Sequence, residues 1–127
     1  MFTHVVLGSN DLDASKKFYD ATLGALGTPP GAEFEGRVMY NSSSGALFAV
    51  RKPLNGEEAT HANGGTVGFA AASPEQVEAF HSAGVSNGGE TCEDPPGVRN
   101  FGEMKFYLAY LRDPAGNKIC AMHPMQA

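Results

Sequence analysis

The 127-residue chain is poor in cysteine and in positive charge, and it contains no tryptophan. Its two cysteines are too few for a disulfide framework, so free thiols in a reducing cytoplasm are expected. Nine basic residues against fourteen acidic ones give a net charge of −5, which argues against a nucleic-acid partner. No apolar run approaches the roughly 18 residues of a membrane span, and no basic segment opens the chain, so neither a membrane anchor nor a signal peptide is expected.

The clearest local pattern is a β-hairpin over residues 106–124. Two apolar runs flank Asp113-Pro114-Ala115-Gly116-Asn117, in which proline presets the backbone of a turn and glycine and asparagine tolerate positive φ. Pairing about this turn predicts three opposed pairs: Tyr110 with Cys120, Leu108 with Met122, and Leu111 with Ile119. The first two pairs share one face and the third lies on the other, so we expect both faces of the hairpin to be covered.

The remaining elements follow from hydrophobic periodicity and from turn residues. The first half predicts a strand, a helix capped near Asp11, a short strand and a hairpin: residues 2–7, 12–23, 33–35, 37–40 and 46–51. The second half predicts a strand at 66–71, a helix begun by Ser73-Pro74, and a short strand at 90–94. Residues 95–97 then turn the chain, and a loop with Arg99 leads into the final hairpin.

Two constant intervals along the chain indicate an internal duplication. The interval from the helix start Asp11 to the helix start Ser73 equals that from Phe18 to Phe80, and we call it the helix interval. The interval from Gly45 to Gly116 equals that from Pro53 to Pro124, and we call it the hairpin interval. The chain therefore predicts an α+β fold of two tandem βαβββ modules.

This duplicated unit, with HVVLGSNDLDASKKFYDATLGALG at its front and YLAYLRDPAGNKICAM at its back, resembles the vicinal oxygen chelate superfamily. That group contains the glyoxalase, bleomycin-resistance and extradiol-dioxygenase proteins. The resemblance covers nearly the whole chain and implies a single domain with two curled mixed sheets, each forming half of a ligand cup. Module one would span about 1–54, a linker about 55–64, and module two about 65–127. Small members of this kind usually form homodimers.

The resemblance also implies a metal site on the first and last strands of each module. His4 matches one ligand position, whereas Val67, Ala49 and Cys120 occupy the positions where partners are usual. A catalytic zinc site ordinarily has three protein ligands, so a divalent zinc, nickel, manganese or iron ion would find a thin ligand set here.

Two residues are candidates for chemistry in the cup. His4 could be a metal ligand or a general base, or simply a hydrogen-bonded strand histidine. Cys120 could be a ligand or a nucleophile activated by His4, or a small buried apolar residue.

Six further side chains are candidates for ligand contact: Arg37, Met39, Arg51, Arg99, Tyr110 and Met122. Transferring the hairpin pairing to the first module puts Arg37 and Arg51 on the face of Ala49, where guanidinium groups would suit an anion. A one-residue change of register would turn both arginines outward. Arg99 could equally be an exposed loop residue, and Tyr110 could serve only as core packing.

Two functions compete, with metal-free catalysis by His4 and Cys120 as a third candidate. One is a glyoxalase-type lyase or isomerase, of the lactoylglutathione-lyase or dioxygenase-like kind, with a degenerate metal site. The other is a metal-free protein that sequesters a small anionic or aromatic molecule, as drug-resistance members do.

Overall fold

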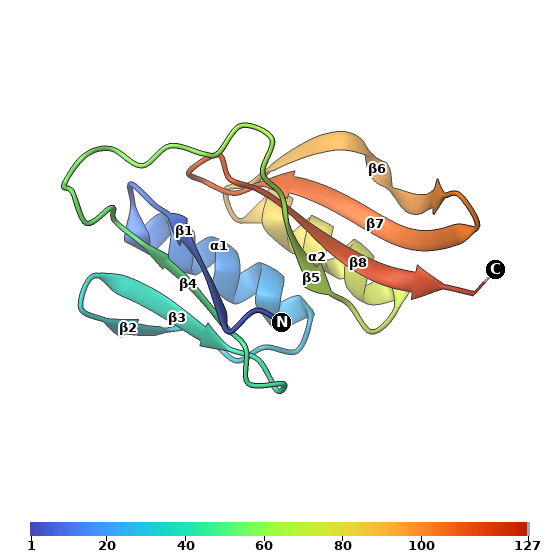
Figure 1. The fold of residues 1–127 in the computed structure, drawn as a ribbon, viewed down its shortest axis with the longest axis horizontal. Helices are drawn as coiled ribbons and strands as arrows, with labels where there is room; N and C mark the ends of the chain where they lie inside the picture. The colour runs from blue at the N-terminus through green and yellow to red at the C-terminus, as the bar shows by residue number, and fades with distance from the viewer. Residues whose placement is uncertain (127) are drawn as a thin grey trace.

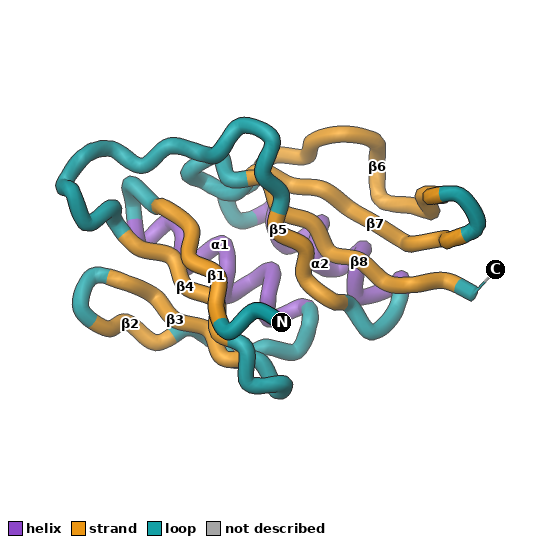
Figure 2. Tube along the Cα trace, in the orientation of Figure 1, coloured by secondary structure: helices purple, strands orange, loops and turns teal. Residues whose placement is uncertain are grey.

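A computed structural model describes residues 1–126; Ala127, the last residue expected in the second module, lies outside them. The first module contains β1 His4–Gly8, α1 Leu12–Ala25, β2 Ala32–Phe34, β3 Arg37–Asn41 and β4 Leu47–Arg51. The second contains β5 Val67–Ala70, α2 Pro74–Ser86, β6 Glu90–Phe101, β7 Met104–Arg112 and β8 Lys118–Met125. Residues 52–66 join the modules as one long loop (Figure 2). Among residues 1–126, no helix has the length and apolar character needed to cross a membrane.

Both helices begin where the sequence places their caps. The Asp11 carboxylate accepts a hydrogen bond from the Ala14 N–H, and the Ser73 hydroxyl accepts one from the Gln76 N–H. These bonds satisfy amide groups that have no partner within the helix. Pro74 occupies the first turn of α2, where a missing N–H costs nothing.

Each module folds into a mixed four-stranded sheet. The strand orders are β1-β4-β3-β2 and β5-β8-β7-β6, so the two modules repeat one topology. In each sheet the first strand runs parallel to the last strand of the module, and the other pairs are antiparallel. The three opposed pairs predicted for the final hairpin are confirmed, and so is the α+β class with two βαβββ modules.

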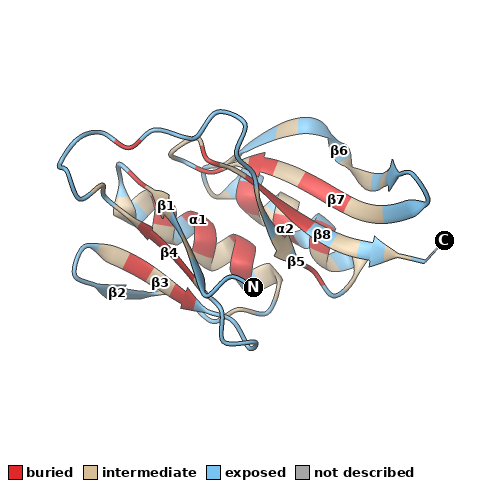
Figure 3. Cartoon of the chain, in the orientation of Figure 1, coloured by how far each residue is buried: buried red, intermediate tan, exposed pale blue. Residues whose placement is uncertain are grey.

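The two sheets stand side by side, with β1 and β5 at the edges that face each other (Figure 1). Both helices lie on the same side of the sheets and pack against each other. One hydrophobic core fills the space between sheets and helices and draws residues from both modules. Figure 3 shows the burial concentrated on α1, α2 and the central strands, while β2 and most of β6 are exposed.

The final hairpin is covered less evenly than its composition predicts. Leu111 and Ile119 are fully buried against the helices, and Leu108 and Cys120 are also buried on the opposite face. Met122, on that second face, is 37% exposed. The face away from the helices is therefore closed near the middle of the hairpin and open toward its end.

The region before the penultimate strand also differs from expectation. Residues 90–101 form one strand, and the predicted turn at 95–97 is a bulge within it. Glu93 has a φ of 58° there, and the Arg99 guanidinium donates to the carbonyl groups of Asp94 and Pro95. Arg99 is thus a strand residue rather than a loop residue. A bulge tolerates proline because the inserted residues form no ladder hydrogen bonds.

A buried polar cluster, which we call the staple, joins the two modules at the end of β1. It consists of Tyr19, Asp113 and Asn117 together with the carbonyl group of Gly8. The Tyr19 hydroxyl donates to the Asp113 carboxylate at 2.6 Å, and Asn117 Nδ2 donates to both Asp113 and Gly8 O at 2.9 Å. Burial, followed by the neighbouring Asp113 charge, raises the pKa of Tyr19 well above its usual value. The DPAGN turn thereby holds the first module as well as closing its own hairpin.

Candidate functional site

The face of each sheet turned away from the helices, which we call the open face, carries the candidate site residues. Side chains alternate along β3, so Val38 and Tyr40 enter the core while Arg37 and Met39 lie on the open face. On the open face of the first sheet is a hollow of about 320 Å³. We call it the arginine hollow; it is lined by His4, Val6, Phe34, Arg37, Met39, Leu47, Ala49 and Arg51.

Two arginines lie directly opposite each other in this hollow. Arg37 on β3 pairs with Arg51 on β4, and Met39 pairs with Ala49 beside them. Like charges at opposed positions repel, so this pair destabilises the sheet unless an anion is present. No carboxylate of residues 1–126 forms an ion pair with either one. Arg51 Nε donates to the Lys52 carbonyl, whereas the buried Arg37 Nε has no partner within the described residues.

His4 lies at the start of β1 and lines the same hollow. It is exposed, and its Nδ1 atom is 2.8 Å from the Thr3 hydroxyl. Among residues 1–126, no three His, Cys, Asp or Glu side chains are grouped as a metal site would require. Arg37 and Arg51 also bring positive charge to the hollow, which repels a divalent cation. The donor set of this hollow therefore does not fit the metal that the family resemblance implies.

The strand pairing in the structure changes which residue of the second module corresponds to His4. Val6 pairs with Ala49 across β1 and β4, and Gly68 pairs with Cys120 across β5 and β8. Gly68 follows Val6 by the helix interval, so the counterpart of His4 is Thr66 rather than Val67. Val67 faces the core with its partner Ile119. The prediction of Val67 as the counterpart of His4 was therefore wrong by one residue. A shift of one residue along a strand moves a side chain to the opposite face of the sheet.

Cys120 lies on the open face of the second sheet, in one row with Tyr110 and Cys92. Burial raises the pKa of the Cys120 thiol to about 11, so it is protonated at neutral pH. Neither thiol forms a disulfide. No hydrogen bond joins Cys120 to His4 in residues 1–126, and they lie on different sheets. This environment works against the predicted nucleophile, which needs a lowered pKa or an adjacent base.

The charged groups around that row are paired within the module. Lys118 forms an ion pair with Glu93 and lies 5.0 Å from the centre of the Tyr110 ring. Arg99 is held by two carbonyl groups of the β6 bulge. Burial raises the pKa of Tyr110 above its usual value, with the Cys120 and Glu93 charges acting in the same direction. Met122 is at the open end of this face. On the second open face, Lys118 and Arg99 thus have partners within the module, whereas Arg37 and Arg51 on the first open face have no acidic partner in the described residues.

Sequence reasoning missed Phe34 and Val6 as lining residues of the arginine hollow. The clue for Phe34 was the pair Glu35-Gly36, which forms a tight turn with positive φ at both residues. That turn sets Phe34 opposite Arg37 and hence on the open face. Val6 follows from the alternation of β1, because it is two residues from His4.

Comparison with known proteins places these features in a family. The model of the glyoxalase/bleomycin resistance protein/dioxygenase superfamily matches residues 1–121. A crystal structure of a glyoxalase/bleomycin resistance protein from Albidiferax ferrireducens T118 is 59% identical to this chain, with a TM-score of 0.94. The match covers 97% of this chain and 98% of that one.

More distant solved structures show the same fold. A glyoxalase/bleomycin resistance protein/dioxygenase family enzyme from Burkholderia phytofirmans PsJN is 13% identical, covers 97% of this chain and 98% of its own, and has a TM-score of 0.72. A glyoxalase-related enzyme from Fulvimarina pelagi is 18% identical over 97% of this chain and 87% of its own, also with a TM-score of 0.72. No curated protein sequence matches the chain.

Proposed function

The chain belongs to the glyoxalase/bleomycin resistance protein/dioxygenase superfamily, and from that premise we propose that it binds a small organic anion in the arginine hollow. The observation that carries the proposal is the opposed pair Arg37 and Arg51 without an acidic partner in the described residues. A carboxylate accepts two parallel hydrogen bonds from a guanidinium group. An anion bound between the two arginines would therefore remove their repulsion and supply acceptors.

The other side chains of the arginine hollow indicate that the part of the ligand away from its negative charge is apolar. Phe34, Met39 and Val6 are apolar, and Phe34 and Val6 are exposed in the free protein. Covering them with a hydrocarbon or aromatic group gains free energy at about 25 cal/mol per Å² of apolar surface removed from water. The ligand we propose is accordingly a monocarboxylate with a flat apolar body, such as an aromatic acid.

Binding without turnover is the activity that this site supports best. Among the side chains that line the arginine hollow, His4 is the one of a type that commonly acts as a general acid or base. The thiol of Cys120 is protonated at that pH and lies on the other sheet. The hollow therefore has positive groups to hold an anion, whereas the ligand set expected of a metal-dependent lyase or isomerase is incomplete.

The binding proposal is tested with benzoate and its uncharged analogue benzamide. We expect benzoate to bind saturably and to raise the melting temperature, while benzamide does neither. The double variant Arg37→Leu/Arg51→Met should bind benzoate at least about tenfold more weakly, because both charge-assisted contacts are lost. The control Lys17→Met/Lys105→Met also removes two positive charges, at exposed positions outside the hollow. Equal loss in both double variants would show a general charge effect and would reject the site.

A metal titration separates this proposal from the family chelate mechanism. We expect zinc, nickel, manganese and iron(II) to produce no saturable rise in melting temperature, and elemental analysis to find no stoichiometric metal. A saturable stabilisation that His4→Ala abolishes would instead assign His4 as a ligand. The missing donors would then have to come from a second subunit, and the lyase mechanism would take precedence.

A second copy of the chain is the proposed cover of the open faces. The two faces are turned to the same side of the chain, so neither covers the other (Figure 1). Several large apolar side chains are exposed on them, namely Val6, Phe34, Phe101, Met104 and Met122. Sedimentation equilibrium should therefore give twice the 13.3 kDa mass of the chain. A monomer at micromolar concentration would contradict this assembly without affecting the benzoate test.

We also infer a reducing compartment, the cytoplasm, as the place of action. Cys92 and Cys120 lie on strands that flank β7, which puts them about 10 Å apart. A disulfide needs Cβ atoms about 4 Å apart, so these thiols do not pair within the fold. Free thiols of this kind persist in a reducing environment.

A further inference from the structure

A second cavity, which we call the junction pocket, lies between the two modules near the start of β1. It has a volume of about 230 Å³. Its lining comes from β1, α1, β3, β4, β5 and the loops beside them, and it shares only Leu47 with the arginine hollow. The staple closes the junction of the modules at the other end of β1, beside Gly8.

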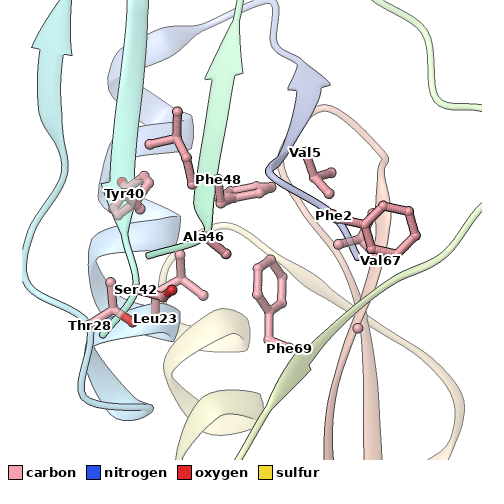
Figure 4. Close-up of a pocket in the computed structure, with 12 residues that line it drawn as sticks. Phe2, Val5, Leu23, Thr28, Tyr40, Ser42, Ala46, Phe48, Val67 and Phe69 are labelled. Carbon is pink, nitrogen blue, oxygen red and sulfur yellow. The ribbon is translucent and has the colours of Figure 1, made fainter. Parts of the chain in front are cut away.

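The inner wall of the junction pocket is buried and largely aromatic. Tyr40, Phe48 and Leu23 form its buried side and belong to the hydrophobic core. Phe69 on β5 stands edge-to-face against Phe48, with 5.1 Å between ring centres and 89° between planes. Phe2 lies at the mouth and is 75% exposed. Figure 4 shows the rings of Phe2, Phe48 and Phe69 gathered around this space.

The internal duplication explains why space is left here. Ser42 and Ala46 are the counterparts of Asp113 and Asn117, which follow them by the hairpin interval. In the second module those positions supply the staple, which fills the junction with hydrogen-bonded side chains. In the first module their smaller counterparts line the junction pocket instead. The end of the junction at the staple is therefore filled by side chains, whereas the end related to it by the duplication contains the junction pocket.

The chemistry of the lining selects the ligand. No charged side chain of residues 1–126 lines the junction pocket, so a charged molecule would lose hydration without gaining a partner. Three lining side chains carry hydroxyl groups, namely Thr28, Tyr40 and Ser42, and the Tyr40 hydroxyl donates to the Asp20 carboxylate. The Ser42 hydroxyl bonds to Ser44, while the Thr28 side chain makes no hydrogen bond in the described residues. One hydrogen-bonding group on a ligand would thus have a partner.

We propose that the junction pocket is a second binding site, which takes a neutral aromatic molecule of one or two fused rings with one hydrogen-bonding group. A dry apolar cavity of about 150 Å³ is large enough to bind benzene, and this pocket is larger and opens to solvent. The aromatic rings around it offer edge-to-face contacts to a flat ligand. This site is independent of anion binding in the arginine hollow, since the two share only Leu47 in their linings.

Indole is the probe that tests the junction pocket. Titrated into isotope-labelled protein, it should shift the amide resonances of Phe48, Val67 and Phe69 with a saturable dependence on concentration. Benzoate should leave these resonances unmoved and shift those of Arg37 and Arg51 instead. The two probes therefore report on the two sites separately, and either proposal can fail alone.

A filling variant supplies the matched control. Ala46→Phe places a ring in the junction pocket from an exposed position, so the core is left intact. It should weaken indole binding by at least about tenfold and leave benzoate binding unchanged. Ala79→Leu adds apolar volume on the exposed face of α2 and should change neither.

Four results would overturn the proposal. Indole shifts confined to the open faces, or no saturable shift up to the solubility limit of indole, would remove the junction pocket as a site. Undiminished indole binding in a folded Ala46→Phe variant would do the same. Tighter binding of indole-3-carboxylate than of indole at the junction resonances would reject the neutral class of ligand.

Discussion

The two modules share a backbone plan, but they carry different side chains at a related pair of opposed strand positions. Arg37 and Arg51 are opposed across β3 and β4. Their counterparts at the hairpin interval, Leu108 and Met122, are opposed across β7 and β8. The leucine and methionine partly cover their own sheet, whereas the arginines repel each other on theirs. The same register thus produces a self-sufficient face in one module and an electrostatically unsatisfied face in the other, and we attribute ligand binding to the unsatisfied face.

A second difference lies in the hairpin turns. The turn at 113–117 is buried through its aspartate and asparagine and ties the modules together. The turn at 41–45 carries serines that are exposed and bond only to each other or to the backbone. The two related turns have therefore diverged: the turn at 113–117 joins the modules through buried hydrogen bonds, and the turn at 41–45 is exposed. The predictions below test this division, from the largest expected effect to the smallest.

Loss of the staple should lower the free energy of unfolding more than any other change proposed here. Asp113 is 4% exposed and accepts hydrogen bonds from the Tyr19 hydroxyl, the Ala115 and Asn117 amides and the Asn117 side chain. Asp113→Ala leaves these donors without an acceptor and should lower the free energy of unfolding by about 3–5 kcal/mol. Ser42→Ala, at the related turn, should change it by less than about 0.5 kcal/mol. Urea denaturation measures both, and equal losses would refute the proposed division of the turns.

Cysteine reactivity should separate a structural thiol from a nucleophile. A rise in pKa from 9.0 to about 11 lowers the thiolate fraction of Cys120 near neutral pH by about a hundredfold. Alkylation of Cys120 in the folded protein should therefore be slow at pH 8 and should accelerate up to about pH 11. Mass spectrometry of labelled peptides follows Cys120 and Cys92 together. Labelling of Cys120 faster than that of a free thiol would restore the nucleophile hypothesis.

Replacing Arg37 and Arg51 by leucine and methionine, the residues at the related positions of the second module, should raise the free energy of unfolding of the ligand-free protein. Arg37→Leu/Arg51→Met removes a like-charge pair and an unpartnered buried Nε atom, with an expected gain of about 1 kcal/mol at low salt. The gain should shrink at high salt, where charge repulsion is screened. Denaturation at two salt concentrations measures it. A loss of stability would mean that the arginines serve the fold rather than a ligand.

The smallest expected effect is a pH dependence confined to the first module. Burial opposes ionisation of Asp20, but hydrogen bonds from the Gly31 amide, Lys16 and the Tyr40 hydroxyl outweigh it and lower the pKa of this carboxyl. The stabilisation by Asp20 is therefore present above the ordinary aspartate pKa and is lost as pH falls through the lower folded value. Asp20→Asn should cost about 1 kcal/mol at pH 7.

That cost should shrink as the pH falls through the lowered folded pKa of Asp20, because the wild-type carboxyl is then itself protonated. Ser82 is the counterpart of Asp20 in the second module, at the helix interval. Ser82→Ala should show no such pH dependence, because neither residue ionises. A constant difference between Asp20→Asn and wild type from pH 7 to pH 2 would contradict the hydrogen-bond account of the pKa.

Much of the candidate site could be predicted because it follows from local rules. Strand alternation and the hairpin pairing were enough to place Arg37 and Arg51 on the face of Ala49. The same rules failed at Val67, since a match to His4 without a fixed register was wrong by one position. Arg99 was misplaced because two prolines predict a turn, and only the partner strand β7 shows that they form a bulge.

The sequence by itself determined the two modules, their helix caps and the succession of helices and strands along the chain, because these depend on interactions between residues close in the chain. Only the tertiary structure decided that the arginines lack a counter-charge, that the DPAGN turn holds the other module, and that a cavity remains between the modules. Each of these depends on which distant side chains come together and how much volume they fill. Spacing along the chain does not specify either quantity.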